Sequence, residues 1–267
     1  MKKYMSFFKI RFINNLQYRA AAYAGVATQF FWGFMLIMIF AAFYKSNADA
    51  FPMKFQEISS YIWLQQSTIA FFLIWYLDNE LFAMITSGGV AYELCRPMDI
   101  YNMWYTKNMA IRAARTLLRC FPILIIAVFL PRPYGLLIPS NFETFILFLI
   151  SMLLAFCVVI SFCMIIYAIS FFTVSSTGIR LLIASISEFL TGHIIPLPFL
   201  PEKLFNVISL LPWASMQNVP FRIYSGNLYG TDAINAILLQ VFWLAALTII
   251  GKLLLNKGLK KVVVQGG

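Results

Sequence analysis

The sequence predicts an all-α polytopic membrane protein with six transmembrane helices, an N-terminal interfacial amphipathic helix and an extracellular re-entrant hairpin before the last span. Hydrophobic residues make up 61% of the chain and charged residues 11%, whereas a soluble domain carries about a quarter charged residues. The apolar residues form blocks long enough to cross roughly 30 Å of hydrocarbon. Lysine and arginine gather on one side of these blocks. Residues 1–267 therefore form a single transmembrane domain.

Residues 1–19 predict an amphipathic helix that lies along the membrane surface. Tyr4, Phe7, Phe8 and Phe12 alternate with lysine and arginine, as in interfacial helices. Two roles stay open, a simple anchor and a part that transmits motion. Because no small-residue cleavage site follows, we expect the first span, and not a cleaved signal peptide, to act as the membrane address.

Six apolar blocks predict the spans. They cover residues 21–44, 59–77, 115–130, 145–172, 178–195 and 234–255. The third block begins among Arg112, Arg115 and Arg119, and long arginine side chains at a span end can reach the headgroups.

Four polar side chains inside these blocks predict a translocation path or a dimer interface. They are Gln65, Gln66, Glu188 and His193. Amides at this depth need protein partners, and an ionisable group in a span is costly unless it faces a partner, a cavity or water. For Glu188 the alternative is a packing role, bonded to a nearby serine or a neighbouring span.

Residues 196–226 predict a re-entrant region on the outer side. Its apolar stretch is too short to cross the bilayer and is interrupted by helix breakers. The glycine and prolines concerned are Gly192, Pro196, Pro198, Pro201 and Pro212. Broken backbone at membrane depth needs protein or water around it, which favours a hairpin packed on the spans.

The distribution of basic residues orients the chain. Fifteen of the twenty lysines and arginines fall on the side that holds both termini and the connection between spans two and three. The positive-inside rule then places both ends in the cytoplasm. The net charge of +10 suits anionic membrane lipids better than nucleic acid, because the basic residues are scattered at the ends of apolar blocks.

The largest cytoplasmic feature is the segment 78–107. Four acids stand there among basic residues, the pair Gly88 and Gly89 can turn the chain, and Pro97 can end a short helix. Such a surface suits docking on another protein, and a plain solvated loop is the alternative. Acid/base catalysis is disfavoured because no nucleophile or metal-ligand set accompanies the acids.

Several signatures are absent from the sequence. It has no GxxxxGK[ST] loop for ATP, no HExxH and no GxSxG, and it has one histidine and four scattered cysteines. We therefore expect no catalytic, cofactor-binding or metal-binding residues in this chain.

Three pieces in a fixed order resemble the permease subunits of ABC transporters of the type-2 export class. They are the surface helix before span one, SGGVAYELCRPMDIYNMW between spans two and three, and TGHIIPLPFLPEKLFNVISLLPWASMQNVPFRIYSG between spans five and six. The third piece is the most specific, and together the pieces cover nearly the whole chain.

The resemblance implies a non-catalytic permease in the cytoplasmic membrane of a prokaryote. A second permease, of the same or a homologous chain, and separate ABC ATPase subunits that hold ATP and Mg would be its partners. The implied ATPase-coupling residues are Gly88, Gly89, Glu93, Leu94, Arg96 and Pro97. An ion-coupled secondary transporter is the alternative; it would show inverted repeats, broken spans in matching halves and more intramembrane charge.

Overall fold

The computed structural model describes residues 2–17, 19–46, 51–139, 141–173 and 176–261. Residues 1 and 18 of the predicted surface helix lie outside these ranges. The helices in chain order are α1 (Lys2–Leu16), α2 (Arg19–Ser46), α3 (Phe55–Ser67), α4 (Ile69–Phe72), α5 (Asn79–Thr86), α6 (Val90–Leu94), α7 (Ile100–Phe129), α8 (Phe142–Ser170), α9 (Ser176–Leu190), the 3₁₀ helix η2 (Leu197–Phe199), α10 (Glu202–Ser209), α11 (Asn218–Ser225) and α12 (Gly230–Leu259). The all-α prediction is confirmed for the described residues.

Three of the described helices are long and apolar enough to cross a membrane. They cover Ala22–Ser46, Phe142–Ser170 and Gly230–Leu259. Each exceeds the roughly twenty residues that a span requires, which identifies a membrane protein. Six spans were predicted, and the other three blocks correspond to a broken pair of helices, to part of a longer helix and to a 15-residue helix.

The second predicted span is broken into two helices. α3 ends at Ser67, α4 covers only four residues, and Leu73 at its end has extended backbone. The third predicted span is the second half of a 30-residue helix, because α7 begins at Ile100, where the Asp99 carboxylate caps it by accepting from the Asn102 amide at 2.9 Å. The fifth corresponds to α9, which has 15 residues.

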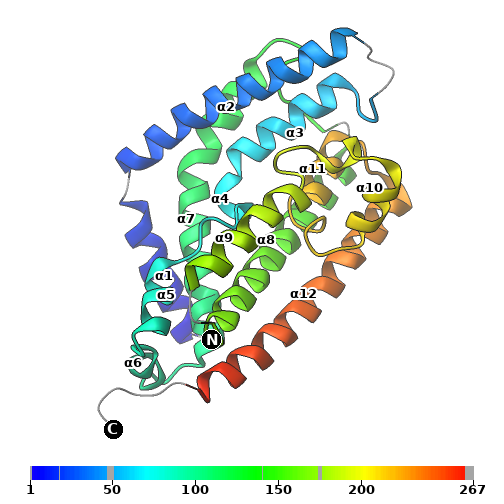
Figure 1. Cartoon of the computed structure of the whole chain (residues 1–267). Helices are drawn as coiled ribbons and strands as arrows, with labels where there is room; N and C mark the ends of the chain where they lie inside the picture. Colours follow the sequence, from blue (N-terminus) through cyan, green and yellow to red (C-terminus); the bar gives the residue numbers. More distant parts are fainter. Residues whose placement is uncertain (1, 18, 47–50, 140, 174–175, 262–267) are drawn as a thin grey trace.

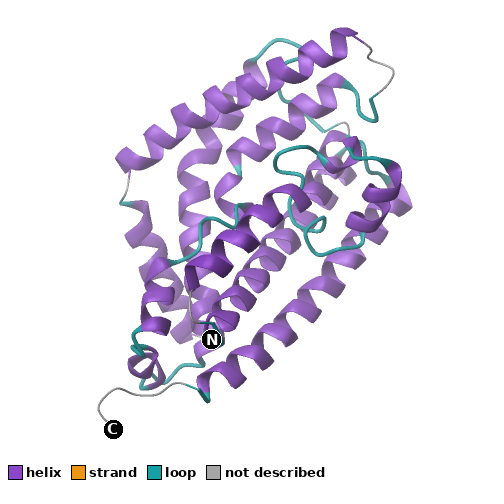
Figure 2. Ribbon diagram, viewed as in Figure 1, coloured by secondary structure: helices purple, strands orange, loops and turns teal. Residues whose placement is uncertain are grey.

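The long helices α2, α7, α8 and α12 form one bundle (Figures 1 and 2). α8 packs along α12 and contacts α7 and α11, while α2 packs on α3 and α7. Aromatic side chains fill the contacts of α11, where the Phe221 ring meets Tyr61 at 5.2 Å and Phe72 at 5.6 Å between centroids. Such edge-to-face pairs add to the apolar burial.

The two ends of the bundle are formed by different helices. α5, α6, the start of α1 and the end of α12 lie at one end, and α10, α11 and the start of α12 lie at the other (Figure 1). The surface helix α1 packs on α7, and its half-buried residues recur at positions 4, 7, 8, 11, 12, 15 and 16. This spacing of three and four is that of one helix face, so the predicted amphipathic helix is present and its inner face is held by α7.

Candidate functional site

Residues 87–97, in the connection between α4 and α7, form a small exposed projection that we call the tip. Gly88 has a φ of +72°, in the left-handed region that glycine adopts without strain, and so the glycine pair turns the chain as expected. The five residues of α6 follow. Tyr92 is 82% exposed and Leu94 52% exposed. Large exposed apolar side chains at a loop end are typical of a surface that binds another protein.

The other predicted coupling residues divide between exposed and buried positions. Arg96 and Pro97 are exposed, whereas Glu93 is 8% exposed and its carboxylate pairs with Arg96 at 3.2 Å. Glu93 therefore orients Arg96 and faces inward. Tyr92 was not among the residues predicted from the sequence, although a large aromatic residue within the short segment between two helix breakers is itself a signal.

The base of the tip is fixed to α7 through Lys107. This lysine is 3% exposed, and its ammonium contacts the carboxylates of Asp78 at 2.8 Å and Glu80 at 2.6 Å. The Asp78 carboxylate also caps α5 by accepting from the Glu80 amide at 2.9 Å. The hydrogen bond from Lys107 lowers the pKa of the Glu80 carboxyl below its ordinary value of 4.5.

Two more long helices hold the same base. The Tyr167 hydroxyl of α8 accepts from the Asp78 amide at 2.7 Å and donates to Asn108 of α7 at 3.1 Å. Arg180 of α9 donates to the Asn79 side chain and lies over the Phe82 ring at 5.5 Å. A displacement of α5 therefore acts on α7, α8 and α9 together.

The far side of the tip is fixed to α1. Lys3 donates to the Pro97 carbonyl at 2.5 Å, and the Asp99 amide donates to the Tyr4 hydroxyl at 3.1 Å. These contacts bridge more than 90 positions in the sequence. The surface helix is thus in direct contact with the tip.

At mid-height, a buried arginine closes the break in the second block. Arg112 is 1% exposed and donates to the carbonyls of Ala70, Phe71, Leu73 and Tyr76 at 2.9–3.3 Å. The sequence suggested that Arg112 extends to the headgroups. It does not, because the unwound end of α4 presents these carbonyls to it. Backbone groups freed by a helix break need such partners at membrane depth.

The side chain of Gln65 contacts His193; both residues were predicted to line a translocation path or a dimer interface. The Gln65 amide donates to the His193 carbonyl at 2.6 Å and lies 3.0 Å from its Nδ1. Gln66 is buried, and its Oε1 has no hydrogen-bond partner among the described residues. The Glu188 carbonyl accepts from the His193 amide at 3.1 Å, whereas the Glu188 carboxylate makes no hydrogen bond or ion pair within the described part of the chain.

The segment from Gly192 to Pro212 folds as short helices around a small core of its own. Gly192 turns the chain with a φ of +78°, Pro201 precedes α10, and Leu197, Ile208 and Ala214 pack together. The indole of Trp213 donates to Ser187 of α9 at 2.8 Å. Gly192 lies after α9, and Pro196 and Pro201 directly precede η2 and α10, whereas Pro198 lies within η2.

Gln240 of α12, which the sequence analysis missed, holds this segment to the bundle. Its amide donates to the carbonyls of Ser151 at 3.2 Å and Ser215 at 2.9 Å. A glutamine in a long apolar helix was the available signal. In the described ranges, no three histidine, cysteine, aspartate or glutamate residues come together to hold a metal ion.

The long apolar helices define an α-helical membrane protein. Residues 26–266 match the family model described as ABC-2 family transporter protein, and the chain belongs to this family as a membrane component. The resemblance drawn from the sequence is thereby confirmed. Comparisons with curated proteins and with solved structures found no match.

Proposed function

We propose that this chain is the transmembrane permease subunit of an ATP-driven exporter of the type-2 ABC class. Its six spans would be α2, the broken pair α3–α4, α7, α8, α9 and α12, with both termini in the cytoplasm. The chain would not be catalytic. ATP and Mg would be bound by separate ATPase subunits, and a second permease, identical or homologous, would complete the path.

The observation that carries this proposal is the way the tip is mounted. Its outer surface is exposed at Tyr92 and Leu94, while its base contacts α7, α8 and α9 and its far side contacts α1 through the bonds described above. Movement of an ATPase bound to the tip would therefore displace several spans at once. When ATP closes the ATPases, this linkage would convert closure into a rocking of the spans, a switch between two packed states.

The region 196–226 would close the outer end of the path as a re-entrant hairpin. Its attachment to α9 through Trp213 and to α12 through Gln240 supports a part that follows the spans when they move. Gln65 and His193 join α3 to the turn before this region, which suits residues that line the path or a permease interface.

The family match favours ATP-driven transport over an ion-coupled carrier. A carrier of that kind would use several intramembrane charges and matching broken spans in two halves. Here one cation, Arg112, is bound to backbone carbonyls, and its role is accounted for by the break in one helix.

Alanine at Tyr92 and Leu94 tests the proposal in the complex with its ATPase. Because few residues carry most of an interface's energy, we expect Tyr92→Ala with Leu94→Ala to reduce co-elution and the permease-dependent ATPase rate about tenfold, equivalent to about 1.4 kcal/mol. Tyr229→Ala is the matched control, since Tyr229 is 76% exposed at the other end of the bundle. Equal effects at both ends, or a chain that purifies with full function and no ATPase, would refute the proposal.

The native Cys95 gives an independent test of orientation. It lies in the tip and is exposed. A membrane-impermeant maleimide should label it in inside-out vesicles and not in right-side-out vesicles, with Cys95→Ser as the blank. Labelling in right-side-out vesicles only would invert the topology and exclude a cytoplasmic ATPase at the tip.

A further inference from the structure

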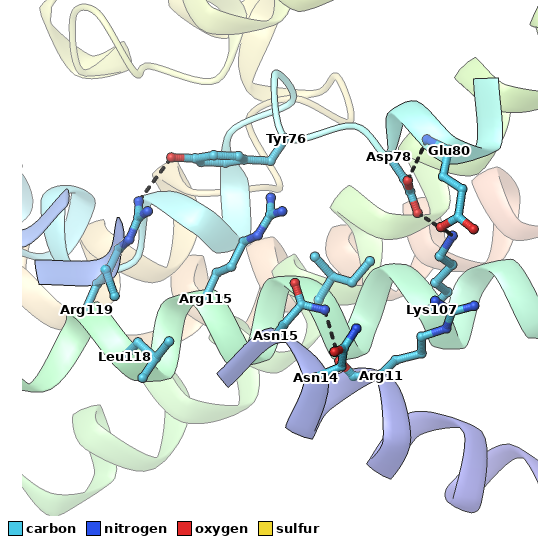
Figure 3. A pocket seen from close by; sticks show the side chains of 12 residues that line it. Arg11, Asn14, Asn15, Tyr76, Asp78, Glu80, Lys107, Arg115, Leu118 and Arg119 are labelled. Carbon is cyan, nitrogen blue, oxygen red and sulfur yellow. Dashed lines mark hydrogen bonds and ion pairs between the residues drawn. The ribbon is translucent and has the colours of Figure 1, made fainter. Parts of the chain in front are cut away.

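A cavity of about 460 Å³ lies between the surface helix α1, the start of α2, the α4–α5 connection and α7. Figure 3 shows Arg11 and Asn14 reaching it from α1, Arg115 and Arg119 from α7, and Tyr76 covering the opposite side. It lies beside the base of the tip, because Asp78, Glu80 and Lys107 form part of its wall, and the proposed coupling assigns no role to its three arginines.

The positive charge in this cavity is only partly neutralised. Asp78 and Glu80 are its two carboxylates, and both are occupied by Lys107. Arg11, Arg115 and Arg119 make no ion pair with any residue that the structure describes. Three guanidinium groups around one partly enclosed space repel one another more strongly than in water. An anion placed between them would remove that repulsion.

Tyr76 and Gly25 orient two of these arginines. The Tyr76 hydroxyl accepts from Arg119 at 3.1 Å, and the Tyr76 ring centroid lies 5.6 Å from the Arg115 guanidinium carbon. The Arg119 guanidinium packs directly on the backbone of Gly25, where a Cβ would come within 2.8 Å of its central carbon. The absence of a side chain at Gly25 thus leaves room for Arg119 in the cavity.

The surroundings of the cavity point to the membrane interface. On α1, Met5, Ile10 and Ile13 are 69%, 66% and 47% exposed. An amphipathic helix with exposed apolar side chains and basic neighbours lies at the level of the lipid headgroups. The arginines therefore reach the depth at which phosphate groups of phospholipids occur, and the planar guanidinium matches phosphate oxygens in pairs.

We propose that this cavity binds the phosphodiester headgroup of an anionic phospholipid through Arg11, Arg115 and Arg119. The bound phosphate joins α1 to α7 by bridging Arg11 on the first and the two arginines on the second. Inorganic phosphate offers the same oxygen atoms, and the apolar flank of α1 favours the lipid as their source.

Native mass spectrometry of the full chain in detergent tests the site, with phosphatidylglycerol and phosphatidylcholine as probes. We expect the wild type to retain phosphatidylglycerol in preference, and Arg115→Gln with Arg119→Gln to weaken its binding at least about tenfold, since two charge-assisted contacts are lost. The charge-matched control is Lys257→Gln with Lys260→Gln, two exposed lysines near the C-terminus, and it should bind as the wild type does.

Gly25→Ala provides a variant that keeps every charge. Its methyl group should displace the Arg119 guanidinium and weaken phosphatidylglycerol binding to a value between the wild type and the double arginine variant. This variant keeps the test decisive if the arginine pair is needed for folding.

Three outcomes would overturn the assignment. Equal weakening by the arginine and lysine pairs would show bulk electrostatic attraction. Wild-type binding in Gly25→Ala, with the protein folded, would show that Arg119 does not contact the lipid. Complete displacement of phosphatidylglycerol by excess inorganic phosphate, with no preference between the two phospholipids, would reassign the cavity to free phosphate.

Discussion

The Lys107 ammonium lies 2.8 Å from the Asp78 carboxylate, which joins α7 to the start of α5, the helix that leads into the exposed tip. Lys107 is almost fully buried, and the Asp78 side chain is 13% exposed. An ion pair in such a place fixes geometry more than it adds stability, but removing one partner leaves a charge without compensation.

We expect Lys107→Met to lower the free energy of unfolding by about 3 kcal/mol, because Asp78 loses its counter-charge. The same variant should uncouple ATPase activity from the permease, since the tip loses its attachment to α7. Thermal unfolding in detergent and the permease-dependent ATPase rate measure the two effects. Lys203→Met changes an exposed lysine and should stay within about 0.5 kcal/mol of the wild type. Similar free energies of unfolding and similar ATPase rates for the two variants would show that the ion pair of Lys107 neither stabilises the fold nor attaches the tip to α7.

The lowered pKa of the Glu80 carboxyl predicts that the protein loses stability at acid pH. Its pKa is lowered chiefly by the hydrogen bond from Lys107, so the folded state binds this proton less readily than the unfolded state. The stabilisation is therefore present above pH 4.5, the ordinary value, and is lost as the pH falls through the lowered pKa. Melting temperatures of the wild type and Glu80→Gln should differ at pH 6, and the difference should shrink as the pH falls through the lowered pKa. A difference that stays constant over this range would contradict the assignment.

Gln65→Leu should cost about 1–3 kcal/mol, because the carbonyl of His193 loses its donor in a buried place. Gln66→Leu is the matched control, since the neighbouring glutamine is equally buried and its Oε1 has no partner. That change should be close to neutral. Chemical or thermal unfolding of both variants decides the point, and a larger loss at Gln66 would show that the Gln65 contact is not a stabilising one.

Arg112→Gln should be among the most destabilising single substitutions, by more than about 3 kcal/mol. The shorter side chain cannot reach the carbonyls of the unwound segment, and each one left without a donor costs about 1–3 kcal/mol. Arg132→Gln, at an exposed arginine in the α7–α8 connection, should have little effect. Hydrogen exchange of residues 69–77 would localise the damage, and unchanged protection there would rule out the proposed role of Arg112.

Much of the helical layout was predictable, because hydropathy and breakers are local properties of the chain. The amphipathic face of α1, the turn at Gly88 and the breaks at Gly192 and Pro201 follow from residue type and spacing alone. The membership of the chain in a transporter family followed from three such pieces in order.

The long-range contacts were not predictable, because they depend on positions far apart in the sequence. Arg112, Arg115 and Arg119 look equivalent in the sequence, and Arg112 alone meets the carbonyls of a helix end some forty positions away. The break after Ser67 has no proline or glycine to announce it. Glu93 can be expected to pair with Arg96 from their spacing of three, but its burial depends on the packing of the rest of the chain.

A photo-crosslinker placed at Tyr92 in the membrane-embedded complex tests most directly whether a separate ATPase binds the tip. We predict a cross-link from position 92 to the ATPase subunit and none from the same group at Tyr229. A cross-link from position 229, or an ATPase bound in the complex but unreachable from position 92, would contradict the account.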